Sequence, residues 1–167
     1  MIPRLDRQCA RKTSPTWLRG LRAYLASIAV GNLGWESLQL PLYTIWNTGT
    51  FREQAFAVVH CTIGDLLIAL STLTLALFIT GNENWPAGRF WQVAILALIF
   101  GIAYTVFSEW LNVVVRASWN YSERMPVVSA VGLRIGVSPL LQWIVVPSAA
   151  FAITKAVTGK HNNGGQS

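Results

Sequence analysis

The sequence predicts an all-α integral membrane protein, a bundle of four transmembrane helices, and three observations support this fold class. Only 12 % of the 167 residues are charged and 53 % are hydrophobic, whereas a soluble domain carries about 25 % charged residues. Four segments each contain the roughly 20 mostly apolar residues that a membrane-spanning helix needs. The composition also excludes a disordered chain, which combines low hydrophobicity with high net charge.

The first expected span covers residues 21–46 and is interrupted by Glu36. Pro41 lies inside it and should kink or locally open the helix, because proline lacks the N–H that the helix needs. A basic stretch precedes this span, so a cleaved signal peptide is an alternative. The apolar pattern continues well past any cleavage point, which favours a retained span.

The second and third expected spans cover residues 55–80 and 90–116. Both are long enough to cross the hydrocarbon core, which is about 30 Å thick. Their ionisable groups are His60, Cys61 and Asp65 in the second span, and Glu109 and Arg116 in the third.

The fourth expected span covers residues 139–156 and has no charge before Lys155. Ser138 could cap its first turn, and Pro139 sits where a missing N–H does no harm. Pro147 inside this span should also kink or open the helix. The domain organisation is therefore a mobile basic arm of residues 1–20, a transmembrane domain of residues 21–157 and a flexible tail of residues 158–167.

The distribution of basic residues predicts that both termini are cytoplasmic. Cytoplasmic segments carry an excess of Lys and Arg. The side of the termini would hold Arg4, Arg7, Arg11, Lys12, Arg19, Arg22, Arg89, Lys155 and Lys160, and the other side Arg52, Arg116, Arg124 and Arg134. The net charge of +6 then indicates anchoring to the lipid bilayer. No nucleic-acid partner is expected, because no basic stripe interleaved with aromatic residues lies outside the arm.

The strongly polar side chains inside the spans all fall in the outer half of the expected membrane. A helix rises about 1.5 Å per residue, which places Glu36 and Asp65 roughly 15 Å, and Glu109 roughly 10 Å, from the outer ends of their spans. His60 and Arg116 are the nearby cations. Two cations cannot neutralise three carboxylates, so at least one carboxyl is expected to be protonated.

Polar and aromatic residues near these acids are candidates for one outward-facing binding pocket. Residues at i, i+3 and i+7 share a helix face, as Glu36, Gln39 and Tyr43 do. Some tryptophans also lie too deep for an interfacial belt and adjoin the acids. The candidate ligand-binding residues are Glu36, Gln39, Tyr43, His60, Asp65, Glu109, Asn112, Arg116, Trp35, Trp110, Gln142 and Trp143.

The connection of residues 117–137 is long for a compact helical bundle, in which connections run about 2–8 residues. Its apolar content favours a lid or a shallow interfacial segment over the outer pocket. A weak repeat also relates residues 36–46 to residues 109–119, where Glu, Leu, an amide and Trp recur in register. Both segments run outward, so the repeat is compatible with two parallel two-helix halves.

Three blocks of sequence carry a resemblance to other proteins. They are HCTIGDLLIA at residues 60–69, YTVFSEWLN at residues 104–112 and SPLLQW at residues 138–143. With these blocks, the chain resembles a group of small four-span bacterial inner-membrane proteins of unassigned function. The resemblance extends over about residues 31–156 and implies the four-span topology, but no chemistry.

The sequence leaves several functions open and determines no cofactor. The first is a pocket that binds or transports a proton, a cation or a small solute, in a homodimer or a larger membrane complex. The second is a membrane enzyme for an apolar or lipid substrate, with Asp65 and Glu109 as acid–base groups and His60 assisting. Metal handling by His60, Cys61 and Asp65 is weaker, since no recognised metal motif is present. The last is an accessory subunit whose polar groups only pack.

Overall fold

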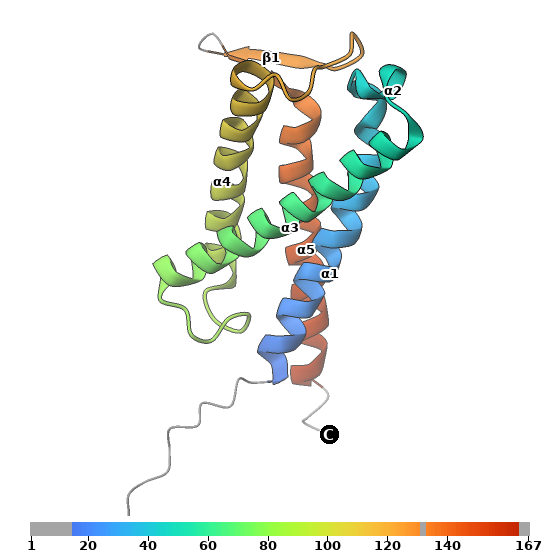
Figure 1. Cartoon of the computed structure of the whole chain (residues 1–167). Coiled ribbons are helices and arrows are strands. Elements are labelled where there is room, and N and C mark those ends of the chain that lie inside the picture. Colours follow the sequence, from blue (N-terminus) through green and yellow to red (C-terminus); the bar gives the residue numbers. More distant parts are fainter. Residues whose placement is uncertain (1–14, 131–132, 164–167) are drawn as a thin grey trace, which may run out of the picture.

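The computed structural model describes residues 15–130 and 133–163, and this part of the chain is mostly helical. Its long helices are α1 (Pro15–Gln39), α3 (Phe51–Thr80), α4 (Phe90–Glu109) and α5 (Val137–Asn163). α1 packs against α5 and α3, and α4 packs against the same two helices (Figure 1). The helices run alternately up and down, so both ends of the described helical chain lie at the same end of the molecule.

Within the described residues, three helical segments are long and apolar enough to cross a membrane. They are Phe51–Thr80, Phe90–Val115 and Val137–Gly159. This finding supports the predicted membrane protein. α1 is not among the three. It carries Arg19 and Arg22 in its first half and Asn32, Glu36 and Gln39 in its second half.

α1 ends seven residues earlier than the first expected span. Pro41 lies in a 3₁₀ turn, Leu40–Leu42, which is followed by the short helix α2 (Ile45–Thr48). The predicted opening at Pro41 is therefore confirmed. At its other end α1 begins at Pro15, so residues 15–20 are helical, whereas the sequence predicted a mobile arm. The preceding part of the arm, residues 1–14, lies outside the described residues.

α3 begins four residues earlier than expected because of a capping box. The Thr50 hydroxyl accepts a hydrogen bond from the Glu53 amide, and the Glu53 carboxylate accepts one from the Thr50 amide at 2.7 Å. This reciprocal pair satisfies two amides that a helix start leaves without partners. α3 ends at Thr80, and the next residue, Gly81, has a φ of 56° that suits glycine.

α4 begins at Phe90, as predicted, and continues into a π-helical turn, Trp110–Val115. α5 begins at Val137 and passes through Pro147 without a break in its assigned helix. It extends to Asn163, so residues 158–163 are helical, whereas a flexible tail was expected from residue 158. Residues 164–167 lie outside the described part.

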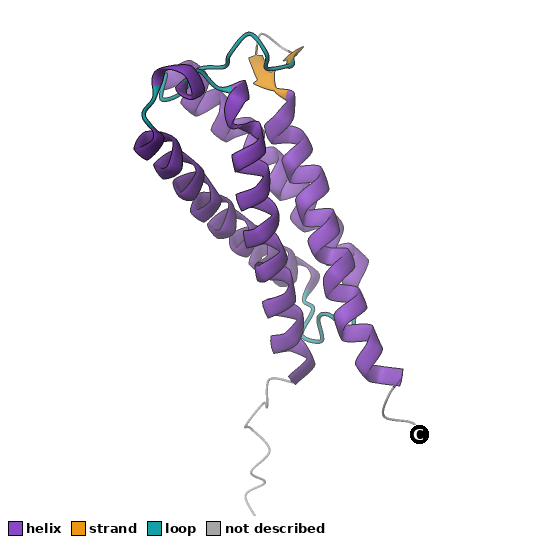
Figure 2. Cartoon of the chain, turned by 90° about the vertical axis from the view of Figure 1, so that its right-hand side faces the viewer, coloured by secondary structure: helices purple, strands orange, loops and turns teal. Residues whose placement is uncertain are grey.

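The connection between α4 and α5 forms an antiparallel hairpin of β1 (Val127–Ala130) and β2 (Leu133–Gly136). The helix-only prediction did not include these strands. Figure 2 shows the hairpin at one end of the molecule and the connection between α3 and α4 towards the opposite end.

The apolar core and the polar interior occupy different parts of the molecule. The core is built from residues such as Leu73, Val93 and Phe151, and it extends to Trp85 in the connection between α3 and α4. Tyr24 of α1 packs on Phe151 of α5, with ring centroids 4.8 Å apart. The buried amide and carboxyl groups lie nearer the hairpin, which places the polar interior at that end.

Candidate functional site

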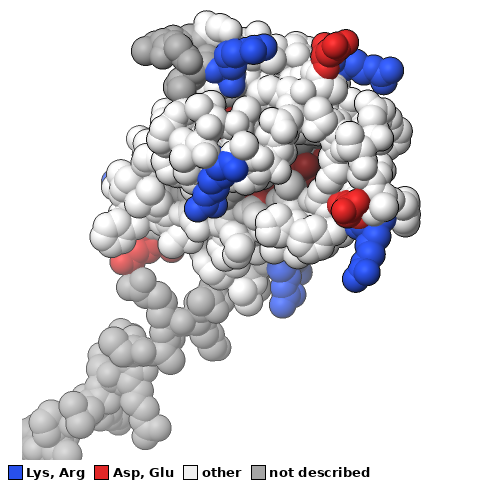
Figure 3. All heavy atoms as spheres, turned by 45° about the horizontal axis from the view of Figure 1, so that its top comes forward, with Lys and Arg blue, Asp and Glu red and all other residues white. Residues whose placement is uncertain are grey.

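A cavity of about 600 Å³ lies at the end of the molecule that carries α2 and the hairpin. In Figure 3 this end faces the viewer, and acidic atoms are visible inside a hollow. All four long helices contribute to the lining, together with residues 118–120 of the connection. The predicted site residues that line the cavity are Glu36, Gln39, Tyr43, His60, Asp65, Glu109, Asn112, Arg116, Gln142 and Trp143.

The side chain of Gln142 joins three helices at the deep end of this cavity. Its amide nitrogen lies 2.9 Å from carboxyl oxygens of both Glu36 and Asp65, and 3.1 Å from the amide oxygen of Asn32. Gln142 is only 2 % exposed. Three acceptors therefore share the two N–H groups of one amide, and this leaves a surplus of acceptors.

Glu36 and Asp65 also lie within hydrogen-bonding reach of each other. Two carboxylates offer only acceptors, so a direct hydrogen bond between them requires one shared proton. This geometry is compatible with the predicted protonation of one of the three acids.

A second set of hydrogen bonds extends the network towards the start of α5. Gln39, which is 5 % exposed, donates to Glu36 at 2.9 Å and to Gln142 at 3.2 Å. Its amide oxygen accepts a hydrogen bond from the hydroxyl of Ser138 at 2.8 Å. Ser138 was expected to cap α5, but the helix begins one residue before it and its hydroxyl bonds to α1. Through these contacts Gln39 and Gln142 each form hydrogen bonds between helices.

Glu109 lies apart from this network and has a different partner. It is 6 % exposed, and its carboxylate accepts a hydrogen bond from the hydroxyl of Tyr121. The Tyr121 oxygen in turn accepts a hydrogen bond from the Gly136 amide at 2.9 Å. Burial, followed by the contact with Glu109, raises the pKa of Tyr121 well above its ordinary value. Tyr121 therefore stays protonated and donates to Glu109.

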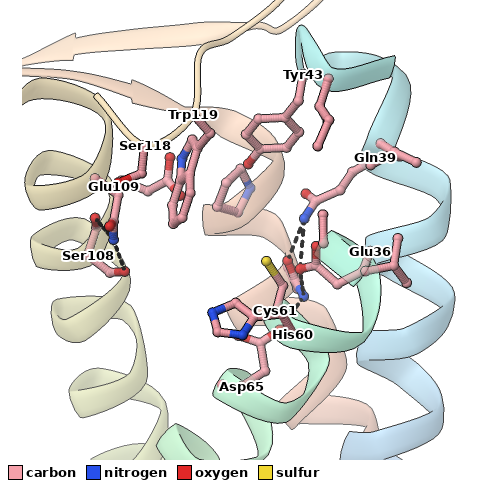
Figure 4. Close-up of a pocket in the computed structure, with 18 of the residues that line it drawn as sticks. Glu36, Gln39, Tyr43, His60, Cys61, Asp65, Ser108, Glu109, Ser118 and Trp119 are labelled. Carbon is pink, nitrogen blue, oxygen red and sulfur yellow. Dashed lines mark hydrogen bonds between the residues drawn. The ribbon is translucent and has the colours of Figure 1, made fainter. Parts of the chain in front are cut away.

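The three acids line opposite walls of the cavity. Figure 4 shows Glu109 on the α4 wall, Glu36 and Asp65 on the other, and Trp119 and Tyr43 over the space between them. Among the residues that the structure describes, none of the three carboxyls has an ion-pair partner. The expected cations His60 and Arg116 line the cavity but pair with neither wall.

The candidate catalytic and metal-binding residues do not form one centre. His60 is exposed and stacks on Phe56, with ring centroids 5.4 Å apart. In the described part of the chain, no hydrogen bond links His60 to Asp65 or Glu109. No group of three or more His, Cys, Asp or Glu side chains could hold a metal ion there either. Cys61 lines the cavity as a half-buried free thiol.

Two predicted tryptophans lie outside the cavity lining. The Trp35 indole turns towards α5 and donates to Ser138 at 3.2 Å. Trp110 is 37 % exposed in the π-helical turn and contacts the ring of Phe107. Both tryptophans were expected to line the cavity because of their depth in the membrane. The rotation of each helix about its axis instead directs the two rings away from the cavity. Asn112 does line the cavity, yet its amide bonds to Ser108 in its own helix, so it does not join two helices.

A cover of residues 40–48 and 117–126 lies over the end of the cavity nearest the hairpin. Its two segments pair at Tyr43 and Tyr121, which form an isolated β-bridge. The Thr44 amide donates to the Asn120 carbonyl at 3.0 Å, and the Ser122 amide donates to the Leu42 carbonyl at 2.9 Å. These bonds hold Tyr43 and Tyr121 beside the acids.

Sequence reasoning missed several residues of this site, among them Asn32, Tyr121 and Trp119. Asn32 lies one helical turn before Glu36, so the same helix-face argument could have found it. Tyr121 and Trp119 lie in the connection, where no periodicity places them. The indole N–H of Trp119 is buried and has no acceptor among the described residues.

Comparisons with known proteins give no assignment for this site. No protein-family model matches the chain, and neither a search of curated proteins nor a search of solved structures gives a match. The resemblance to small four-span bacterial proteins therefore stays a prediction, and the site is interpreted from its own residues.

Proposed function

We propose that the chain is a multi-pass inner-membrane protein that binds a small cationic solute in the acidic cavity. α1 would form the fourth span, and both termini would be cytoplasmic, so that the cavity faces outward. One observation carries this proposal: three carboxyl groups line one cavity without an ion-pair partner among the described residues. A buried negative charge without a partner is unfavourable, and a bound cation would supply that partner.

The apolar core favours binding over transport. Below the Gln142 network, the interior consists of side chains such as Leu73, Val93 and Ala97, each at most 2 % exposed. Polar side chains at this level, such as Thr72, bond within their own helix. A conduction pathway needs polar steps on both sides of the membrane, so the arrangement supports a site that is open at one end.

Equilibrium binding to the detergent-purified protein tests the proposal. Chlorides of sodium, calcium and an organic amine would be titrated while thermal stability is recorded. We expect at least one cation to raise the melting temperature saturably, because a ligand that binds only the folded state stabilises it. Asp65→Asn should weaken this effect.

The matched control is Glu123→Gln, which also removes one acidic charge at this end of the molecule. Glu123 is exposed and lies outside the cavity lining, so this variant should behave like the parent chain. A response to no cation, or one that Asp65→Asn leaves unchanged, contradicts the proposal.

A further inference from the structure

The separation of the acids limits what kind of cation the cavity can hold. Glu36 and Asp65 lie on one wall and Glu109 on the other (Figure 4). No described group of three His, Cys, Asp or Glu side chains is close enough together to hold a metal ion. Calcium takes six to eight oxygen ligands at about 2.3–2.6 Å, and a wall with two carboxyl groups supplies only part of such a set.

The size of the cavity is that of a site for an organic ligand. Its volume of about 600 Å³ lies within the range of about 300–1,000 Å³ of small-molecule pockets. A second hollow shares Ile45, Ala57, His60, Cys61 and Trp119 with it. The polar cavity therefore borders a more apolar hollow that could accept the carbon skeleton of a ligand.

Aromatic rings line the space between the acids. Tyr43 and Trp119 lie over it, and Tyr104 and Trp143 contribute to the walls. Ring faces attract organic cations within about 6 Å of the centroid, and Trp does so best. Carboxylates combined with aromatic rings suit a charged nitrogen that carries apolar groups.

The hydrogen-bonding capacity of the walls points to the same chemistry. The two N–H groups of the Gln142 amide face three acceptors, on Asn32, Glu36 and Asp65. An ammonium group supplies N–H donors to such a surplus. The Trp119 indole N–H has no described acceptor, and an organic ligand with an oxygen could accept it, which a metal cation cannot.

We propose that the cationic ligand is a small organic ammonium compound. This inference rests on the proposed function and specifies its ligand class. The ammonium group binds beside Glu36 and Asp65, and the carbon skeleton packs against Trp119 and Tyr43.

Isothermal titration calorimetry with three probes of similar shape tests this inference. Benzylammonium carries the charge, benzyl alcohol is neutral and benzoate has the opposite charge. We expect saturable binding of benzylammonium alone. Asp65→Asn should weaken it about tenfold or more, and Trp119→Leu about fivefold, the range of a contact between two aromatic rings. Trp119→Phe should retain most of the affinity, and Tyr43→Leu gives a second aromatic test if Trp119→Leu fails to fold.

Sodium and calcium chlorides, titrated in parallel, separate the two proposals. Asp65-dependent binding of sodium or calcium, with no binding of or competition by benzylammonium, overturns the organic-ligand inference and leaves the cation site standing. The organic-ligand inference is also overturned if benzyl alcohol binds as tightly as benzylammonium. The same holds if Trp119→Leu binds benzylammonium as tightly as the parent chain does. Binding of no cation at all overturns the proposed function and this inference with it.

Discussion

The side-chain amide of Gln142 donates to the carboxyl of Asp65 at 2.9 Å, which joins the second turn of α5 to the middle of α3. The same amide contacts Glu36 of α1. One buried residue therefore ties together the three helices that form the deep end of the cavity. Such a side chain sets the relative positions of the acids as well as contributing to stability.

Asp65 and Gln142 should show energetic coupling. In a double-mutant cycle of Asp65→Ala and Gln142→Leu, we expect a coupling energy of about 0.5–3 kcal/mol, as found for residues in one hydrogen-bond network. The free energies of unfolding in detergent provide the measurement. The control pair is Asn112→Ala with Gln142→Leu, whose effects should add, since Asn112 bonds to Ser108. If the changes in the free energy of unfolding add in both pairs, Asp65 and Gln142 do not belong to one hydrogen-bond network.

Tyr121→Phe should destabilise the protein at neutral pH. The change removes the donor to Glu109, and leaving a buried acceptor without a partner costs about 1–3 kcal/mol. Tyr104→Phe is the control, because Tyr104 is 45 % exposed and lines the same cavity; it should change stability little.

The cost of Tyr121→Phe should also shrink at alkaline pH. The pKa of Tyr121 is raised in the folded protein, so its contribution is present below the unfolded value of about 10. That contribution is lost as pH rises from there through the higher folded value. Unfolding measured at pH 8 and pH 11 should show a smaller difference between the two chains at pH 11. If the difference in the free energy of unfolding between the two chains is the same at pH 8 and pH 11, this prediction is wrong.

Gly101→Ala should destabilise the packing beside the cavity. A Cβ atom at Gly101 would lie 2.4 Å from the Trp143 ring, so the ring must move, and such overpacking costs about 1–3 kcal/mol. A Cβ atom at Gly34 of α1 would meet nothing within 4 Å. Gly34→Ala should therefore be neutral or stabilising by up to about 1 kcal/mol, since alanine favours helices. Thermal unfolding of Gly101→Ala and Gly34→Ala gives the comparison. Equal melting temperatures would show that the Trp143 ring does not pack tightly on Gly101.

Local sequence signals predicted the helices well, because hydropathy and capping act over a few residues. The start of α4 at Phe90 and the break at Pro41 follow directly from such signals. The earlier start of α3 comes from Thr50 and Glu53, a capping box that is readable in the sequence but was overlooked. The strands of the hairpin were not predicted, since pairing depends on how the connection folds back over α4 and α5.

The sequence predicted many of the residues that line the cavity, but few of the contacts that they make. One helix face brought Glu36 and Gln39 to the cavity, as their spacing indicated. Tyr43 lines the same cavity from extended chain after the 3₁₀ turn, and the prediction that it shares the helix face was wrong. The partner of Glu109 is Tyr121, which lies in an irregular connection whose path no periodicity fixes. Trp35 has the right depth but turns towards Ser138, because helix rotation is set by tertiary packing.

The proposed topology predicts the labelling of two single cysteines. In a chain with Cys9→Ser and Cys61→Ser, Thr48→Cys should react with a membrane-impermeant thiol reagent from the periplasmic side. Asn84→Cys should not react from that side. Both positions are exposed and lie at opposite ends of the molecule. The reverse labelling pattern contradicts the orientation.

The reactivity of Cys61 tests the central claim of an acidic, outward-open cavity most directly. In a Cys9→Ser chain in right-side-out membranes, the rates of a cationic and an anionic methanethiosulfonate of similar size are compared, each relative to its rate with a free thiol. The ratio of the two normalised rates does not depend on the reactivity of the Cys61 thiol, since the same thiol reacts with both reagents. We expect the cationic reagent to react about tenfold faster or more, because carboxylates that line the same cavity as Cys61 attract a cation and repel an anion. Glu36→Gln with Asp65→Asn should bring the ratio close to one. Equal rates in the parent chain, or no reaction from the outer side, contradict the account.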